Sequence, residues 1–452
     1  MNKSTVKHQI ELTLKHLEPH LALANVHMVD YFTKNAFATH IPHQIRDESS
    51  NHGYQDTIRA IYAQQTEHLP ALNMYIQKSR ELTLKNTTVC MSLAQFRNKL
   101  NELGGQEASS LKLDIFMKSK KSHEVEILSG AVAAIRDLSR TSHLIDIGDG
   151  KGYLSSMLAL HYQIPVLGVD ASEINTNGAV DRANKLSKVW NGVVTNIKTR
   201  ETSINCYKQI TKFVDEKVDF PELISNIFLQ KSDKIGLVGL HTCGNLTPTC
   251  LKIYNECDSI RTICNVGCCY HHLTEEFPKA PSNKIGFPLS AFLKNKECAI
   301  GRGARMVAAQ SIERILDSKD QPNRSIFYRA LFEIIKNQHS QAECLKEKQV
   351  GRFRKPIPLF LDYVQKASKR LEMPLEVSET YINALLAEFE HRSDEIDLFY
   401  LIRAMLAPVV ESLIILDRVL FLLENEHYNS FIVQFFDPVL SPRCYGIVSI
   451  KT

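Results

Sequence analysis

Apolar residues change their spacing several times along the chain. In residues 1–119 they recur mainly at three- and four-residue intervals, which is typical of amphipathic helices. Between residues 142 and 270, short apolar runs of strand length alternate with helical segments. Helical spacing returns in residues 280–395, and two β-rich runs at 431–438 and 445–451 close the chain. This pattern predicts an α/β fold whose mostly parallel sheet ends in an antiparallel hairpin at its edge.

The alternating part predicts a series of strands and the loops that follow them. The expected strands are the apolar run before Gly148, IPVLGVD (164–170), NGVVTNI (191–197), KIGLVGL (234–240) and the run that ends near Cys268. Residues 200–232 are polar and irregular, which suggests an insertion. A single long helix is expected over roughly 396–425, ahead of the hairpin.

These patterns divide the chain into four segments. They are a helical N-terminal region (1–119), the first part of the α/β core (120–279), a helical basic insertion (280–395) and the closing helix and hairpin of the core (396–452).

The stretch SHLIDIGDGKGYLS (142–155) carries the most informative motif. A short apolar strand leads into Gly148, Gly150 and Gly152, and a helix-like segment starts at Tyr153. Glycine lets a ligand approach the backbone, and the first N–H groups of a helix are unpaired, so the arrangement favours a nucleotide-like cofactor. The dinucleotide pattern G-x-G-x-x-G is not met, because Tyr153 stands where its third glycine belongs.

An acidic residue two positions before the first glycine distinguishes this loop further. The string Asp146-x-Gly148-x-Gly150-x-Gly152 resembles motif I of class I S-adenosylmethionine-dependent methyltransferases. We therefore predict S-adenosylmethionine as the cofactor, with a first group of binding residues at Asp146, Gly148, Asp149, Gly150, Gly152 and Tyr153.

Further cofactor contacts are expected where the following strands end. Asp170 lies 24 residues after Asp146, near the spacing of the acid that binds ribose hydroxyls in nucleotide-binding βαβ units. An alternative role for Asp170 is to cap the next helix. Asn196 ends the expected third strand, and His241 and Cys243 follow the next one, so these residues are also predicted to bind the cofactor.

Three histidines are candidates for the base that methylation of a hydroxyl requires. They are His241, His271 and His272, each at or just after a strand end, although a structural role is an alternative for every one of them. Six of the eleven cysteines lie between residues 243 and 269. With these histidines they could form a zinc site, but no C-x₂-C pair is present here, and strand-end thiols commonly serve packing, so we predict no metal site.

The composition is that of an ordinary globular protein. The 452 residues are 44% hydrophobic and 23% charged, with a net charge of +4. The N-terminal residues lack the apolar stretch of a signal peptide, and charged residues interrupt the apolar segment 401–423, so no membrane span is expected. Eleven cysteines without a secretion signal indicate a reducing compartment, the cytoplasm or the nucleus. No pattern indicates an oligomeric state.

The insertion contains a local excess of positive charge. Residues 291–355 hold 14 Lys and Arg against 7 Asp and Glu, and GRFRKPIP (351–358) places an aromatic residue among basic ones. Such a segment beside a methyl-donor site favours an RNA partner. An ordinary solvated helical surface is the alternative. The segment 117–138 also starts with basic residues. They either face the cofactor or form a solvated helix start in which His123 has a structural role.

An ordered set of stretches between residues 120 and 444 adds a family resemblance. They are KKSHEV (120–125), IDIGDGKGYLS (145–155), GLHTCGNLTP (239–248), NVGCCYHHLTEE (265–276), GFPLS (286–290), LAPVVESLIILDR (406–418) and LSPRC (440–444). Together they resemble the methyltransferase-like protein 25 family, which includes a relative labelled as a ribosomal RNA adenine dimethylase domain protein. The CG and CCxH strand ends also look similar to a tRNA 2′-O-methyltransferase family.

The resemblance implies a Rossmann-like class I methyltransferase fold and S-adenosylmethionine binding. Two departures stand out. Asp149 replaces the small residue common in relatives, which would put another carboxylate near that of the cofactor. The Asn/Asp-Pro-Pro-aromatic motif of adenine amino-methylating enzymes is absent, and HTCG (241–244) occupies its place. We expect a methyltransferase acting on RNA, at a 2′-hydroxyl or a base. The alternatives are a non-catalytic binding or scaffold protein of this fold and a protein methyltransferase.

Overall fold

A computed structural model describes the chain from residue 1 to residue 451, with gaps. The gaps are 107, 110, 114, 116, 194–205, 279–284, 319–323, 340, 341, 346 and 347.

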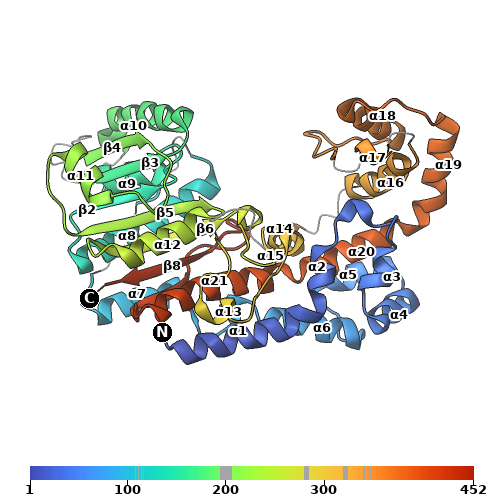
Figure 1. Ribbon diagram of the computed structural model, residues 1–452, viewed down its shortest axis with the longest axis horizontal. Coiled ribbons are helices and arrows are strands. Elements are labelled where there is room, and N and C mark those ends of the chain that lie inside the picture. Colours follow the sequence, from blue (N-terminus) through green and yellow to red (C-terminus); the bar gives the residue numbers. More distant parts are fainter. Residues whose placement is uncertain are drawn as a thin grey trace.

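The fold is built on an eight-stranded sheet with the strand order β1-β7-β8-β6-β5-β2-β3-β4 (Figure 1). Its strands are β1 (Cys90–Ser92), β2 (His143–Ile147), β3 (Val166–Asp170), β4 (Tyr207–Thr211), β5 (Ile235–Cys243), β6 (Ile260–Cys268), β7 (Ser430–Gln434) and β8 (Tyr445–Ile450). All neighbours are parallel except β8, which is antiparallel to both β6 and β7. The predicted α/β class, with a mostly parallel sheet and a terminal antiparallel hairpin, is confirmed.

The prediction of a strand at 191–197 is wrong for the residues that are described. Residues 191–193 end the helix α10 (Glu173–Val193), and the strand beside β3 is β4, inside the segment expected to be an insertion. The apolar residues near position 191 continue the helical spacing of α10, so the short run was wrongly predicted as a strand. Asn196 lies outside the described residues.

The sequence predicted that the closing hairpin forms the edge of the sheet, and this prediction is wrong. β1, contributed by the N-terminal region, pairs in parallel with β7 and forms the edge instead. Three residues are too few for a periodic signal, because side-chain alternation needs a longer run to show. The segment 1–119 is otherwise mostly helical, and its first helices share a hydrophobic core with the rest of the chain.

The N-terminal helices wrap segments that lie far away in the sequence. These helices are α1 (Lys3–Leu17), α2 (Leu21–Asn25), α3 (Ala36–His40), α4 (His43–His52), α5 (Tyr54–Ala63), α6 (Pro70–Glu81) and α7 (Leu93–Glu102). α7 begins with a capping box: the Ser92 side chain accepts a hydrogen bond from the Gln95 N–H, and the Gln95 side chain accepts one from the Ser92 N–H.

Two groups of helices flank the sheet. α9 (Tyr153–Leu160) contacts both α8 (Ser119–Ser139) and α10, and α9 and α10 pack on β3 and β4. α12 (Leu246–Glu256) packs on β5 and β6 and contacts the closing helix α21, and α11 (Phe220–Phe228) precedes β5.

The insertion and the closing segment contribute nine further helices among the described residues. They are α13 (Ala291–Lys294), α14 (Arg302–Val307), α15 (Ile312–Ser318), α16 (Ser325–Gln338), α17 (Ala342–Leu345), α18 (Phe360–Leu371), α19 (Glu379–Phe389), α20 (Ser393–Ala404) and α21 (Ala407–Glu424). Figure 1 shows α16 to α19 as a lobe at the far end of the molecule from the sheet. α1 packs along α21, α2 against α14 and α5 against α20, which ties the N-terminal helices to this part.

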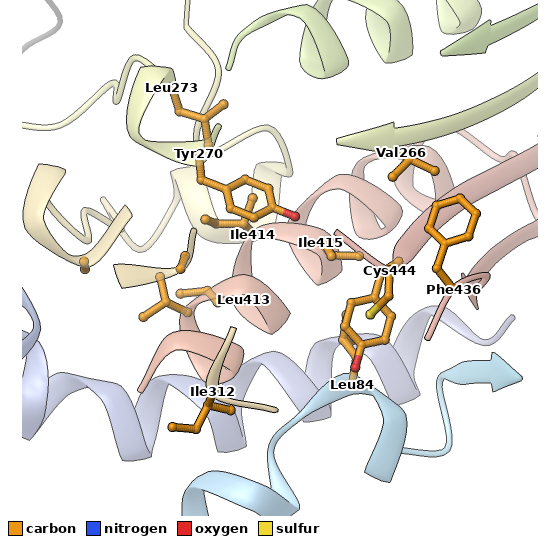
Figure 2. Packing of buried hydrophobic residues seen from close by; sticks show 14 of the residues in the cluster. Leu84, Val266, Tyr270, Leu273, Ile312, Leu413, Ile414, Ile415, Phe436 and Cys444 are labelled. Atoms are coloured by element: carbon orange, nitrogen blue, oxygen red, sulfur yellow. The ribbon is translucent and has the colours of Figure 1, made fainter. Parts of the chain in front are cut away.

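The expected long helix over 396–425 is two helices. Met405 ends α20 and α21 restarts at Ala407, with Pro408 in its first turn, where the missing N–H of proline leaves no helical bond unmade. α21 is buried on nearly all sides because it lies between α1 and the sheet. Figure 2 shows residues of α21 packed against residues from β6, the loop after it and the last part of the chain; those labelled include Leu413, Ile414, Ile415, Val266, Tyr270 and Phe436. Across the described residues, every helix is too short or too polar to span a membrane.

Candidate active site

A cavity of about 660 Å³ opens where β2, β3 and β5 end. Ligands bind at this edge in open α/β sheets, because the loops that follow parallel strands converge there. Its walls are Ile147, Gly148, Gly150, Val169, Asp170, Ala171, Asn175, Lys212, Phe213, Val214, Asp215, Glu216, Lys217, His241, Cys243, Asn245, Leu246, Thr249 and Ile285.

The structure divides the predicted cofactor residues into two sets. Five of them line the cavity, namely Gly148, Gly150, Asp170, His241 and Cys243. Four others, Asp146, Asp149, Gly152 and Tyr153, belong to the same motif but do not line it. The glycine motif therefore has a side that faces the cavity and a side that faces the protein interior.

Gly150 presents bare backbone to the cavity. Its φ is 61°, a left-handed conformation that costs other residues about 1–2 kcal/mol. A methyl group built on it would come no closer than 3.8 Å to other heavy atoms of the protein, so a ligand can approach the main chain. The Gly150 N–H donates to Asp170 Oδ2 at 3.0 Å, which fixes the loop against the end of β3.

Asp170 combines the two roles considered for it. Its carboxylate lines the cavity, and its Oδ1 accepts from the Ser172 N–H at 2.8 Å and from Asn175 Nδ2 at 3.1 Å, at the start of α10. These bonds orient the carboxylate. A carboxylate offers about four lone-pair sites, so it can accept further hydrogen bonds from a ligand.

Asp149 points away from the cavity, contrary to the expectation that its carboxylate lies near that of the cofactor. Its Oδ1 accepts from the Ser155 hydroxyl at 2.7 Å and its Oδ2 accepts from the Tyr207 hydroxyl. The Ser155 hydroxyl oxygen also lies 2.9 Å from Asp146 Oδ2, so it links the two carboxyl groups. The acidic residues of the motif thus form a buried network with α9 and β4 beneath the loop.

Burial disfavours two negative charges in this network. Burial, and then the charge of Asp149, raises the pKa of Asp146 well above its ordinary value. Burial also raises the pKa of Asp149, although hydrogen bonds from Tyr207 and Ser155 oppose the rise. Two adjacent buried carboxyl groups favour one shared proton over two negative charges.

Gly152 and Tyr153 also serve this interior side. Gly152 has a φ of 64°, and an added methyl group would collide with the Tyr207 hydroxyl. The Tyr153 ring lies 4.1 Å from the Arg182 guanidinium, on the next helix. Both residues therefore pack the loop on α10 and β4.

His241 is the one candidate base, of the three predicted, that lines the cavity. It sits at a bulge of β5 with a φ of 73°, and its Nε2 lies 3.0 Å from Glu124 Oε2 on α8. A carboxylate at Nε2 favours the tautomer that carries the proton there, which leaves Nδ1 as a proton acceptor. This is the arrangement by which a carboxylate orients a general base.

Glu124 was not recognised from the sequence as a site residue. It is fully buried, and it also accepts from Lys121 Nζ at 2.7 Å and from the Ser441 hydroxyl at 2.6 Å. Burial alone would raise its pKa, but hydrogen bonds and charges from His241 and Lys121 outweigh burial and hold the pKa of Glu124 well below its usual range. The KKSHEV stretch therefore contacts a cavity residue, His241, through Glu124, whereas His123 contacts the loop after β7.

His271 and His272 lie outside the cavity walls. Their rings are 4.1 Å apart in a short turn after β6, and the His272 backbone packs against Gly244. The structure therefore does not bring them together with His241 at the cavity surface.

Three thiols meet beside His241. Cys243 Sγ is 3.1 Å from Cys268 Sγ and 3.5 Å from Cys269 Sγ. The hydrogen bond from Cys268, with help from Cys269 and nearby imidazoles, outweighs burial and lowers the pKa of Cys243 to about 6.

The loop after β4 supplies cavity walls that sequence reasoning missed. Residues 212–217 line one side, and the exposed Phe213 provides an aromatic surface there. They were missed because β4 itself was assigned to an insertion. Leu246, at the start of α12, adds an apolar wall opposite.

Comparison with known proteins agrees with this geometry. A family model described as a methyltransferase domain matches residues 120–276, which contain the strands and loops that form most of the cavity. The chain is 27% identical to "Probable methyltransferase-like protein 25" of Homo sapiens over an alignment of 596 positions, covering 99% of this chain and 97% of that protein. The protein of the same name from Mus musculus is also 27% identical, with the same coverage. These matches confirm the prediction of a methyltransferase, and the chain resembles the methyltransferase-like protein 25 family over nearly its whole length.

Proposed function

We propose that this methyltransferase uses S-adenosylmethionine to methylate RNA, at an acceptor that must lose a proton. The observation that carries the proposal is the cavity itself, where bare glycine backbone, an oriented carboxylate and a carboxylate-bound histidine face one space.

The size and the lining of the cavity support this choice of cofactor. Its volume of about 660 Å³ lies within the range of small-molecule sites, which is roughly 300–1,000 Å³. Asp170 would accept hydrogen bonds from ribose hydroxyls, and Gly148 and Gly150, which have no side chains, would let the polar end of the cofactor approach the main chain. Phe213 and Leu246 offer apolar surface to the adenine ring.

S-adenosylmethionine supplies a methyl group on a sulfonium sulfur, so the protein needs mainly to align the acceptor and exclude water. His241 would take the proton of the acceptor at Nδ1. Glu124 would hold the imidazole in the required tautomer and stabilise the imidazolium that results. Because Glu124 acts through His241, it is a positioning residue.

The support for RNA as the acceptor comes from the insertion. Two of its basic side chains make contacts within the protein: Arg314 donates to the carbonyls of Val439 and Leu440, and Arg324 pairs with Glu390. Residues 352–355 hold three further basic side chains and Phe353, whose ring stacks on the Arg370 guanidinium at 4.1 Å. They lie in the lobe far from the cavity (Figure 1), so an acceptor that contacts both must be extended, as an RNA strand is.

A methyl-transfer assay tests the proposal. The full chain is incubated with radiolabelled S-adenosylmethionine and with fractionated RNA and protein. We expect label in RNA that ribonuclease releases and protease does not. His241→Asn should abolish the transfer, whereas His272→Asn, an exposed histidine outside the cavity walls, should retain it.

Other outcomes select the alternatives. Label that survives ribonuclease and is released by protease would contradict RNA as the acceptor and favour a protein methyltransferase. Binding of S-adenosylmethionine with no transfer to either fraction would favour a non-catalytic member of this fold.

A further inference from the structure

The three thiols beside the cavity form a compact donor set. The sulfur atoms of Cys243, Cys268 and Cys269 all lie within 4.8 Å of one another. They come from the ends of two adjacent strands, because Cys243 of β5 is paired directly with Cys268 of β6 and Cys269 follows at once. From the sequence, a zinc site of these cysteines with the histidines was an alternative, but no metal site was predicted because no C-x₂-C pair is present and strand-end thiols commonly serve packing.

Local backbone irregularities bring these sulfur atoms together. The register of β5 against β6 shifts between Leu240 and Thr242, where His241 takes a φ of 73°. Cys269 has a φ of 50°, also in the left-handed region. Each conformation costs a residue other than glycine on the order of 1–3 kcal/mol, and such irregularities cluster at functional sites. Without the bulge, the side-chain alternation of β5 would aim Cys243 at the opposite face.

The surroundings suit a negatively charged cluster. Arg418 is 2% exposed, and its Nη1 lies beside Gly267, the residue before Cys268. A methyl group added to Gly267 would lie 2.5 Å from this nitrogen. Within the part of the chain that the structure describes, the Nε and Nη2 atoms of Arg418 have no hydrogen-bond partner. A buried cation of this kind would help to compensate the net charge of −1 that three thiolates and a divalent cation carry together.

We propose that Cys243, Cys268 and Cys269 bind one Zn²⁺ ion through three thiolates. Zinc prefers tetrahedral coordination, so three protein ligands leave a fourth position for water or for a donor atom of the substrate. Cys243 lines the cavity, which places this open position on the side where the acceptor enters. On binding, each protonated thiol releases its proton to solvent and no electron is transferred. His241 is not part of this donor set, since its ring nitrogens are not among the atoms that lie within 4.8 Å of one another.

The metal site is independent of the proposed cofactor, so its test does not rely on methyl transfer. The full chain is purified under reducing conditions and its zinc content is measured by mass spectrometry of the elements. We expect about one Zn²⁺ per chain, and after removal by a chelator we expect Co²⁺ to give the intense visible bands of tetrahedral thiolate coordination.

Serine variants locate the site. Cys243→Ser and Cys269→Ser should each lower zinc affinity by more than about 10–100-fold, the loss typical of removing even an outer partner of a metal site. Cys344→Ser, which changes an exposed cysteine of the helical lobe, should leave affinity unchanged. Thermal unfolding of the metal-free variants checks that they are folded.

Three results would overturn the proposal. One is wild-type protein that contains no zinc and gives no cobalt bands. Another is equal metal affinity in the wild type and Cys243→Ser. The third is a disulfide between Cys243 and Cys268 in protein purified under reducing conditions, which would assign these thiols to a redox pair.

Discussion

The two sides of the glycine loop differ in what they contact. On the cavity side, Gly150 and Asp170 present backbone and a carboxylate to the space at the strand ends. On the interior side, Asp149 and Asp146 are bound by Ser155, and Asp149 also by Tyr207. Residues that alternate within one short motif therefore have separate tasks.

The difference explains why the motif is acidic and rich in glycine at once. Glycines with positive φ open the backbone to a ligand, but they stiffen the loop little. The buried carboxyl network supplies the stiffness by fastening the loop to α9 and β4. Changes on the cavity side should therefore reduce ligand binding or catalysis with little effect on stability, and changes on the interior side should do the reverse.

The largest expected effect is on catalysis from the cavity side. His241→Asn removes the proposed base, so the rate of methyl transfer should fall about 10²–10⁴-fold while the Kd for S-adenosylmethionine changes less than about threefold. Single-turnover kinetics and calorimetry measure the two quantities. Equal losses in rate and affinity would contradict a role in proton transfer.

Gly150→Arg tests the cavity side for binding. The arginine side chain would fill the space that Gly150 leaves open, so affinity for S-adenosylmethionine should fall more than about 100-fold, for a cost of about 1–2 kcal/mol in backbone strain. Gly104→Arg is the matched control, because Gly104 also has positive φ and open surroundings but lies outside the cavity walls. Retained affinity in Gly150→Arg would refute the proposed cofactor position.

Asp149→Ala tests the interior side. It leaves the Tyr207 hydroxyl without its acceptor, so the free energy of unfolding should fall by about 2–4 kcal/mol with affinity for S-adenosylmethionine nearly unchanged. Tyr207→Phe combined with Asp149→Ala should cost less than the sum of the single changes, by about 1 kcal/mol or more. If Asp149→Ala instead raised cofactor affinity without destabilising the fold, the carboxylate would lie near the cofactor after all.

Glu124→Gln should show the smallest effect, and one that depends on pH. The pKa of Glu124 is lowered in the folded state, so its ionised form stabilises the fold at pH values above its unfolded pKa of about 4.3, and this contribution is lost as pH falls toward the folded pKa. The stability gap between wild type and variant, about 1–3 kcal/mol at neutral pH, should therefore shrink in acid.

Urea unfolding at several pH values measures this gap. Glu126→Gln, two residues further along the same helix and half-buried, is the matched control for the change of side chain. A gap that stays constant below about pH 4 would contradict the buried pairing of Glu124 with His241 and Lys121.

The sequence predicted the sheet well where strands are long and apolar. β3, β5 and β6 were recognised because they are buried on both faces and read as continuous apolar runs. β1 and β4 were missed, since the first has three residues and the second is half exposed at the sheet edge. Local patterns carry little information on such strands, because their pairing is decided by the rest of the fold.

Only part of the site was predictable, because local sequence patterns do not show which distant segments meet. Gly150, Asp170 and His241 follow strands directly, so topology alone places them at the cavity. The inward turn of Asp149 depends on Tyr207, 58 residues away, and the orientation of His241 depends on Glu124, 117 residues away. No spacing rule links such positions.

Calorimetric titration of the full chain with S-adenosylmethionine, run beside Asp170→Asn and Asp149→Ala, tests the division of the loop most directly. We expect about one site per chain in the wild type, a loss of affinity of at least about tenfold in Asp170→Asn, and nearly wild-type affinity in the folded fraction of Asp149→Ala. No heat of binding in the wild type, or a larger loss of affinity in Asp149→Ala than in Asp170→Asn, would contradict the division of the loop into a cavity side and an interior side.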